Sequence, residues 1–253
     1  MTPREARPSI TVFFPAYNDA GSIRTLVETA LGVLPMLADE YEVLIIDDGS
    51  TDATGAIIDD LAAHHPAVRA IHHERNTGYG GALRSGFRQA SKDLVFYTDG
   101  DGQYDVREIV LLHARMTPAV DVVNGYKITR SDPVARRVIG WCYKWMARSV
   151  FRLPIRDVDC DFRLIRRSAV ERIELKSSSG AICVELVHQL RRAGCAFAEV
   201  PVHHYPRVHG RSQFFTVGRI ARTALDLCRV RLRFGSQAQM TTLVVLGRLL
   251  ELV

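Results

Sequence analysis

Near its middle the chain reads Val95-Phe96-Tyr97-Thr98-Asp99-Gly100-Asp101-Gly102-Gln103-Tyr104. The apolar first half is typical of a buried strand, and the polar second half places two acids and an amide at every other position. Side chains at this spacing point the same way in an extended segment, so we expect Asp99, Asp101 and Gln103 to converge just beyond a strand. Their oxygen atoms suit Mg²⁺ or Mn²⁺, which take their other ligands from water and substrate phosphate. A simple polar turn is the alternative.

A second strand that ends in paired acids favours a metal site over a simple polar turn. The apolar run that begins at Tyr41 closes on Asp47 and Asp48. Its Val-Leu-Ile-Ile core indicates a strand buried on both faces, as in a parallel sheet. The candidate caps of the following helix are Ser50, Thr51 and Asp52. Because ligands of open α/β sheets bind beyond the carboxyl ends of the strands, two acidic strand ends predict one shared site.

Strands and helices alternate along the first half of the chain. The strands that we expect cover 10–14, 42–47, 68–72, 93–98 and 120–124. The helices that we expect cover 22–34, 52–64, 78–91 and 106–116. Pro15 is expected to end the first strand, and Ser22 to cap the first helix. This alternation indicates an α/β fold with βαβ units and a mostly parallel sheet flanked by helices.

Composition and charge narrow the class of protein. The 253 residues are 47% hydrophobic and 24% charged, which is typical of a folded globular chain. The five cysteines form no Cys-x-x-Cys pair, so we expect reduced thiols and no zinc site. Seven arginines and one acid, Asp226, lie between Arg207 and Gly235 without a recognisable nucleic-acid-binding motif. An anionic membrane surface or a phosphate ligand is therefore expected as a partner, and nucleic acid is not.

Two later segments, 134–152 and 216–234, combine an apolar stripe with a basic one at helical spacing. The apolar positions of the second are Val217, Ile220, Ala221, Ala224, Leu225, Cys228 and Leu232. The charged positions opposite are Arg219, Arg222, Asp226, Arg229 and Arg233. Such a helix packs its apolar face on a core or lies in a membrane interface, and both interpretations stay open. We expect one domain over 1–213 and a basic, membrane-associated helical tail over 214–253.

Seven motifs follow one another between about residues 8 and 213. They are Phe14-Pro15-Ala16-Tyr17-Asn18-Asp19, Ile46-Asp47-Asp48-Gly49-Ser50-Thr51-Asp52, Asn76-Thr77-Gly78-Tyr79-Gly80-Gly81-Ala82, Asp99-Gly100-Asp101-Gly102-Gln103, Asp157-Val158-Asp159-Cys160-Asp161-Phe162-Arg163, Glu199-Val200-Pro201-Val202 and Arg207-Val208-His209-Gly210-Arg211-Ser212-Gln213. In this order the motifs resemble the inverting family-2 glycosyltransferases with a GT-A fold. Within that family the chain is similar to the polyprenyl-phosphate branch, which includes dolichyl-phosphate mannose synthase-like enzymes.

The resemblance implies roles for residues of these motifs. Binding of a nucleotide sugar is implied for Pro15, Tyr17, Asp19, Asp48, Asp99 and Lys127. A divalent metal, Mg²⁺ or Mn²⁺, is implied at Asp99, Asp101 and Gln103. The implied catalytic residues are Asp101 and Asp157, the latter at the position of an acceptor-side carboxylate. Binding of the acceptor phosphate is implied for Arg207, Arg211, Ser212 and Gln213.

Three positions depart from the pattern of the family. Asp161 stands where glycine is common in D-x-x-x-G-F-R, and Gln213 stands where the loop R-x-x-G-x-S-K ends in lysine. Lys127 stands where arginine is frequent. These departures bear on the choice of sugar and lipid more than on the fold. The signature Q-x-x-R-W of processive synthases is absent from the sequence, which favours a single transfer.

The function implied is metal-dependent, inverting transfer of one sugar from a UDP- or GDP-linked donor to a polyprenyl phosphate of the dolichyl or undecaprenyl type. The protein would act peripherally at the cytoplasmic face of the cell membrane. A lipid phosphate is already ionised at neutral pH, with a second pKa of about 6. Asp157 would then position other groups, whereas with a hydroxyl acceptor it would act as a general base.

Other functions stay open at this point. One is transfer to a sugar hydroxyl of a glycolipid or polysaccharide, and another is a non-catalytic membrane-associated scaffold with the same fold. A Rossmann dehydrogenase is disfavoured, because Pro15 and the three residues after it occupy the place of the glycine-rich turn.

Overall fold

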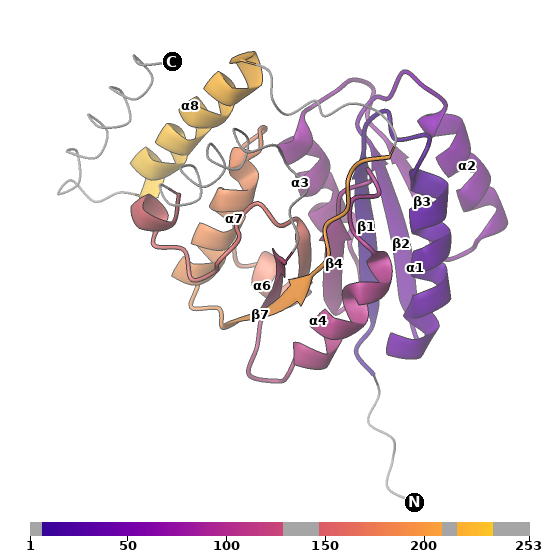
Figure 1. Cartoon of the computed structure of the whole chain (residues 1–253), viewed down its shortest axis with the longest axis horizontal. Coiled ribbons are helices and arrows are strands. Elements are labelled where there is room, and N and C mark those ends of the chain that lie inside the picture. Colours follow the sequence, from indigo (N-terminus) through magenta and orange to yellow (C-terminus); the bar gives the residue numbers. More distant parts are fainter. Residues whose placement is uncertain (1–6, 129–146, 209–216, 235–253) are drawn as a thin grey trace, which may run out of the picture.

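A seven-stranded sheet forms the centre of the computed structural model, which describes residues 7–128, 147–208 and 217–234 (Figure 1). The strands are β1 (Ile10–Ala16), β2 (Tyr41–Asp47), β3 (Val68–His72), β4 (Leu94–Thr98), β5 (Val122–Lys127), β6 (Phe162–Arg166) and β7 (Phe197–Val202). Their order in the sheet is β3-β2-β1-β4-β6-β5-β7. All pairings are parallel except those of β6, which runs antiparallel between β4 and β5. The predicted mixed, mostly parallel sheet is thus confirmed.

Helices cover both faces of this sheet (Figure 1). They are α1 (Ile23–Leu37), α2 (Thr54–His64), α3 (Tyr79–Gln89), the 3₁₀ turn η1 (Val106–Glu108), α4 (Ile109–Arg115), α6 (Arg167–Val170), α7 (Ala181–Arg192) and α8 (Val217–Phe234). One apolar cluster joins the sheet to α1, α2 and α4, and another joins it to α3, α7 and α8. Successive residues of β1 supply opposite clusters, Val12 the first and Phe13 the second, because side chains alternate along a strand. This double burial explains why β1 and β2 are apolar nearly throughout.

Two prolines lie inside elements that the sequence predicts to end earlier. β1 continues through Pro15 to Ala16, where its ladder with β2 persists although its ladder with β4 ends at Phe13. The Pro15 carbonyl still accepts a hydrogen bond from the Gly100 N–H at 3.1 Å. α1 likewise continues through Pro35, which falls in its last turn. Ser22 precedes α1 but makes no capping bond, since its hydroxyl donates to the Gly100 carbonyl at 2.7 Å.

Other predicted boundaries shift by a few residues. The helix predicted at 106–116 begins with the 3₁₀ turn η1, and the last strand of the first half lies at Val122–Lys127. Most of the helix predicted at 134–152 falls outside the described residues, although 147–151 are helical. The predicted boundary between 213 and 214 also falls outside them, so the division into a domain and a tail stays a prediction. No helix in the described part of the chain is both long and apolar enough to cross a bilayer.

The predicted amphipathic helix exists as α8, but its buried face differs from the prediction. α8 packs against α7, and it buries Thr223, Asp226, Leu227 and Val230. The sequence places Asp226 and Arg233 on the solvent side with the other charged residues. In the structure Asp226 is buried and accepts a hydrogen bond from the Ser179 hydroxyl, whereas Arg233 stays exposed, as predicted, and donates to Glu185 of α7. Burial of a charge is tolerated where it has such partners, which periodicity alone does not reveal.

Candidate active site

Three loops meet at the carboxyl ends of β1, β2 and β4. The Gly100 N–H donates to the Pro15 carbonyl, and the Asp48 N–H donates to the Ala16 carbonyl at 2.9 Å. A Cβ atom at Gly100 would lie 2.9 Å from the Pro15 carbonyl oxygen and 3.2 Å from a carboxylate oxygen of Asp19. Only glycine leaves room for this close approach. The predicted site residues of the first and fourth strands are therefore brought together.

Asp19 and Asp101 flank the side chain of Arg207. One terminal nitrogen of Arg207 donates to Asp101, and the other lies 4.0 Å from Asp19 Oδ1. Burial raises the pKa of Asp19 to about 6, and the charge of Asp101 adds to this effect. The Tyr17 N–H, which donates to Asp19 at 3.0 Å, and Arg207 oppose it. The Arg207 guanidinium therefore already supplies a positive charge to these two carboxylates.

Asp99 and Asp101 are both held in surroundings that disfavour their ionised forms. Burial raises the pKa of Asp99 well above its ordinary value, and the charges of Asp161 and Asp101 raise it further. Burial also raises the pKa of Asp101, which Arg207 opposes. The Tyr79 hydroxyl donates to Asp99 at 2.7 Å and fixes its orientation. A divalent cation between the two carboxylates would relieve their repulsion, so these oxygen donors fit Mg²⁺ or Mn²⁺.

The same carboxylates would supply only part of a metal's coordination. Within the described ranges, no group of three or more His, Cys, Asp or Glu side chains could hold a metal ion. Gln103 contacts the segment after β7, since its side-chain nitrogen Nε2 donates to the Tyr205 carbonyl at 3.0 Å and its backbone carbonyl accepts from the Tyr205 N–H at 2.8 Å. Gln103 therefore ties the strand-end loop to the segment after β7, and its place as a metal ligand stays a prediction.

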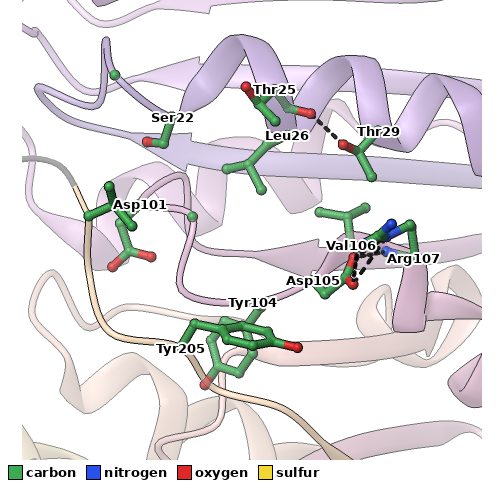
Figure 2. A pocket seen from close by; sticks show the side chains of 13 residues that line it. Ser22, Thr25, Leu26, Thr29, Asp101, Tyr104, Asp105, Val106, Arg107 and Tyr205 are labelled. Carbon is green, nitrogen blue, oxygen red and sulfur yellow. Dashed lines mark hydrogen bonds and ion pairs between the residues drawn. The ribbon is translucent and has the colours of Figure 1, made fainter. Parts of the chain in front are cut away.

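A cavity of about 550 Å³ opens beside Asp101. Figure 2 shows Thr25 and Leu26 of α1 on one side of it and Tyr104 and Tyr205 on the other. Its volume lies within the usual range of small-molecule pockets. One side of Asp101 is accordingly next to open space and not packed protein.

Asp48 lies at the predicted edge, but protein groups occupy both of its carboxylate oxygens. One oxygen accepts from the Thr77 N–H and hydroxyl at 2.8 and 2.6 Å and contacts His73 Nδ1 at 2.7 Å. The other accepts from the Gly78 N–H at 2.9 Å. Asp48 thus holds the segment before α3, and its predicted contact with a nucleoside stays a prediction.

Asp157 and Lys127 lie together at the end of β5. Asp157 is buried, and a carboxylate oxygen accepts from the Lys127 N–H at 3.4 Å. The Lys127 ammonium donates to the Asp159 carbonyl at 2.8 Å, and its charge lowers the pKa of Asp99. The structure therefore brings Lys127 near the acids of β4. The predicted residues Arg211, Ser212 and Gln213 lie outside the described residues.

Residues 11–174 match the family model described as glycosyl transferase family 2. The chain belongs to glycosyl transferase family 2. It is 31% identical to the glycosyltransferase AglD of Haloferax volcanii, over 93% of this chain and 38% of that protein. It is 28% identical to the undecaprenyl-phosphate 4-deoxy-4-formamido-L-arabinose transferase of Enterobacter sp. (strain 638), over 85% of this chain and 65% of that protein. The chain thus spans between 38% and 65% of the length of these two relatives.

Solved structures agree with the predicted GT-A fold. Glucosyl-3-phosphoglycerate synthase of Mycobacterium tuberculosis, crystallised with Mn²⁺, UDP and glucosyl-3-phosphoglycerate, superposes with a TM-score of 0.66 at 18% identity, covering 91% of this chain and 82% of that one. The mannosyltransferase PcManGT of Pyrobaculum calidifontis, in complex with GDP-mannose and Mn²⁺, gives 0.64 at 21% identity, covering 89% and 65%. The family and fold predictions are confirmed.

Two residues of β6 and the segment before it, Asp161 and Arg163, lie beside this site although their pattern in the sequence does not predict it. Asp161, noted only as a departure from the family pattern, accepts a contact from Cys183 Sγ at 3.1 Å and from the Tyr97 hydroxyl at 3.5 Å. Its charge helps to raise the pKa of Asp99. Arg163 is fully buried beside it and donates to the Tyr97 hydroxyl. The signal available in the sequence was an acid and an arginine flanking Phe162, a pattern that becomes informative only once β6 is known to lie next to β4.

Asp19→Asn should stabilise the protein above pH 6. An acid whose folded pKa is about 6, against an ordinary 3.8, costs stability once it is ionised. Because one pH unit corresponds to about 1.36 kcal/mol, the cost is at most about 3 kcal/mol above pH 6 and disappears as the pH falls towards 4. Thermal or urea unfolding of both proteins at pH 8 and pH 4.5 measures this difference.

Asp93→Asn is the matched control for that measurement. Ser9 donates two hydrogen bonds to Asp93, from its N–H at 3.0 Å and its hydroxyl at 2.8 Å, and these lower the pKa of Asp93. A lowered pKa stabilises the fold at higher pH, so this substitution should have the opposite sign. Equal stability of wild type and Asp19→Asn at both pH values would show that the pKa of Asp19 is not raised in the folded protein.

Proposed function

We propose that this chain transfers one sugar, with inversion, from a UDP- or GDP-linked donor to a polyprenyl phosphate. The observation that carries the proposal is the pair Asp99 and Asp101 at the end of β4, with Arg207 bound to Asp101. The two carboxylates are candidate ligands for the metal that binds a nucleotide diphosphate, and the neighbouring guanidinium suits the phosphate of an acceptor. The name of the Enterobacter relative, which refers to undecaprenyl phosphate, supports the same acceptor class.

Each group at the edge would have a separate task. A bound Mg²⁺ or Mn²⁺ would act as a Lewis acid that neutralises the charge of the leaving diphosphate. Tyr79 would keep Asp99 oriented towards that ion, and Asp48 would hold the loop before α3 in place. Because a lipid phosphate is ionised at neutral pH, no base is required. Asp157 would then position Lys127 and not remove a proton.

Arg207 can contact a carboxylate and a phosphate at once. A guanidinium has five N–H donors in a planar arrangement, of which the contacts with Asp101 and Asp19 engage only part. Arg207 belongs to the segment after β7 that Gln103 binds at Tyr205. We propose that this segment presents Arg207 to the acceptor phosphate next to the donor diphosphate.

The donor is tested by measuring thermal stabilisation with UDP and with GDP, each with Mn²⁺. A ligand present at 100 times its dissociation constant stabilises the folded state by about 2.7 kcal/mol. We expect one of the two nucleotides to raise the midpoint of unfolding, and EDTA to abolish the rise. If neither UDP nor GDP raises the midpoint of unfolding, the donor is not a UDP- or GDP-linked sugar.

The outer face of α8 is the proposed membrane contact. Leu225 and Leu232 are 54% and 61% exposed, and they lie on the side of α8 that faces away from α7. Arg222 and Arg229, also exposed, lie beside this apolar strip at helical spacing. An apolar strip next to arginines suits the interface of an anionic bilayer. We propose that α8 holds the protein peripherally at the cytoplasmic face of the membrane, where nucleotide sugars are available.

Arg222→Glu should release the protein from anionic vesicles. Each arginine near such a surface contributes about 1 kcal/mol, so replacing attraction by repulsion should weaken binding about tenfold or more. Co-sedimentation with phosphatidylserine-containing vesicles measures the change. Arg115→Glu, an equal charge reversal at the end of α4, is the control and should bind like the wild type. If both variants bind as tightly as the wild type, the contact proposed for α8 is wrong.

A further inference from the structure

The start of α3 touches a neighbouring loop backbone to backbone. This loop, residues 176–180, is called the serine loop below, and residues 78–81 are called the glycine segment. The Gly80 N–H donates to the Ser178 carbonyl at 3.0 Å. A Cβ atom at Gly80 would lie 2.2 Å from the Ser177 carbonyl oxygen, and one at Gly78 would lie 2.5 Å from that of Ser178. The glycine segment and the serine loop therefore cannot move independently without losing this fit.

The serine loop is held from its other side by α7 and α8. Glu185 of α7 is fully buried, and its carboxylate accepts from the Ser177 N–H at 2.7 Å and from Arg233 of α8 at 2.7 Å. A second contact joins the Ser179 hydroxyl to Asp226 of α8 at 2.8 Å. Two residues of α8 thus fix the serine loop, Asp226 directly and Arg233 through the buried carboxylate of Glu185.

The glycine segment in turn contacts the site. Its first residue, Gly78, donates to Asp48, and Tyr79 donates to Asp99. Tyr79 is half-buried, and its hydroxyl is held by this hydrogen bond to Asp99 at 2.7 Å. A displacement of the glycine segment would therefore move the groups that orient Asp48 and Asp99.

We infer that α8 positions the nucleotide and metal site through the serine loop and the glycine segment. Arg233, Asp226, Glu185 and Ser179 are positioning residues in this arrangement, since each acts through another group. The inference rests on the proposed function for the identity of the ligand. It assigns α8 a second task besides the proposed membrane contact, because its inner face fixes the loop while its outer face remains exposed.

Calorimetry with UDP and with GDP, each with Mn²⁺, tests this inference on the full chain without membranes. Arg233→Gln leaves the buried Glu185 with one partner fewer, and we expect it to weaken binding of the preferred nucleotide about five- to tenfold, the lower part of the range for coupled sites. Arg222→Gln removes the same charge from the exposed side of α8 and should bind like the wild type. Ser179→Ala, a milder change at the other contact, should weaken binding about two- to threefold.

A double-mutant cycle separates positioning from a general loss of structure. In the Tyr79→Phe background the effect of Arg233→Gln should shrink, because the hydrogen bond through which α8 acts on Asp99 is gone. If Arg233→Gln fails to fold, the pair Arg233→Gln and Glu185→Gln removes the unpaired buried charge and should show the same weakened binding. A dissociation constant of folded Arg233→Gln within twofold of the wild type, or fully additive effects of Arg233→Gln and Tyr79→Phe, would overturn the inference. Failure of the proposed function would differ, since the wild type would then bind neither nucleotide.

Discussion

Asp101→Asn is expected to lower sugar transfer at least about a hundredfold while the protein stays folded. A metal that neutralises the leaving diphosphate is worth several kcal/mol, and each 1.36 kcal/mol of barrier is about tenfold in rate. Asparagine can still accept the hydrogen bond that Asp101 receives from the Gln103 N–H at 3.0 Å, so the loop should keep its shape. The rate is measured with a labelled donor and polyprenyl phosphate over a range of Mn²⁺ concentrations.

Asp105→Asn is the control for this substitution. Asp105 lies in the same loop, but its carboxylate pairs with Arg107 and not with Arg207. Its replacement should leave transfer within a few-fold of the wild type. Full activity of Asp101→Asn, or full activity of the wild type in EDTA, would show that transfer does not depend on a metal bound at Asp101.

Arg207→Lys is expected to separate two activities of the protein. Lysine keeps the positive charge but loses the planar pair of donors that binds two phosphate oxygens together. A hydrogen bond to a charged group contributes about 1.5–3 kcal/mol, so transfer to polyprenyl phosphate should fall about ten- to a hundredfold. Slow hydrolysis of the nucleotide sugar, which needs no acceptor phosphate, should fall much less.

Both activities of Arg207→Lys are measured on one preparation with the same labelled donor. Arg107→Lys serves as the control, because Arg107 is exposed and pairs with Asp105. It should leave both activities unchanged. An equal loss of transfer and hydrolysis in Arg207→Lys would assign Arg207 to the donor diphosphate instead of the acceptor.

The sequence was sufficient to predict the acidic edge of the sheet. Asp48, Asp99 and Asp101 each follow an apolar strand, and parallel strands bring such ends to one edge. The partners of these acids could not be predicted, because they come from distant segments. The backbone N–H groups that bind Asp48 belong to Thr77 and Gly78, directly before α3, and the hydroxyl on Asp99 belongs to Tyr79. Local patterns identify a strand end, but tertiary packing decides which donors reach it.

Helical periodicity likewise predicted only part of which α8 residues are buried. It predicted the helix and the apolar strip with Leu225 and Leu232, which the structure leaves exposed. It placed Asp226 on the solvent side, because it could not include Ser179, whose hydroxyl donates to the buried Asp226 carboxylate. Arg233 is exposed as predicted, but its contact with Glu185 of α7 could not be read from periodicity. The antiparallel strand β6 was missed for a similar reason, since its direction depends on how the chain returns between β4 and β5.

One assay tests most directly whether the acceptor is a lipid phosphate. The protein is incubated with the nucleotide sugar that binds, Mn²⁺ and anionic vesicles that contain either polyprenyl phosphate or the corresponding polyprenol. Mass spectrometry of the lipids identifies the products. We predict one sugar per polyprenyl phosphate, attached through the phosphate, and no glycosylated polyprenol. Glycosylated polyprenol, with polyprenyl phosphate unchanged, would contradict the account.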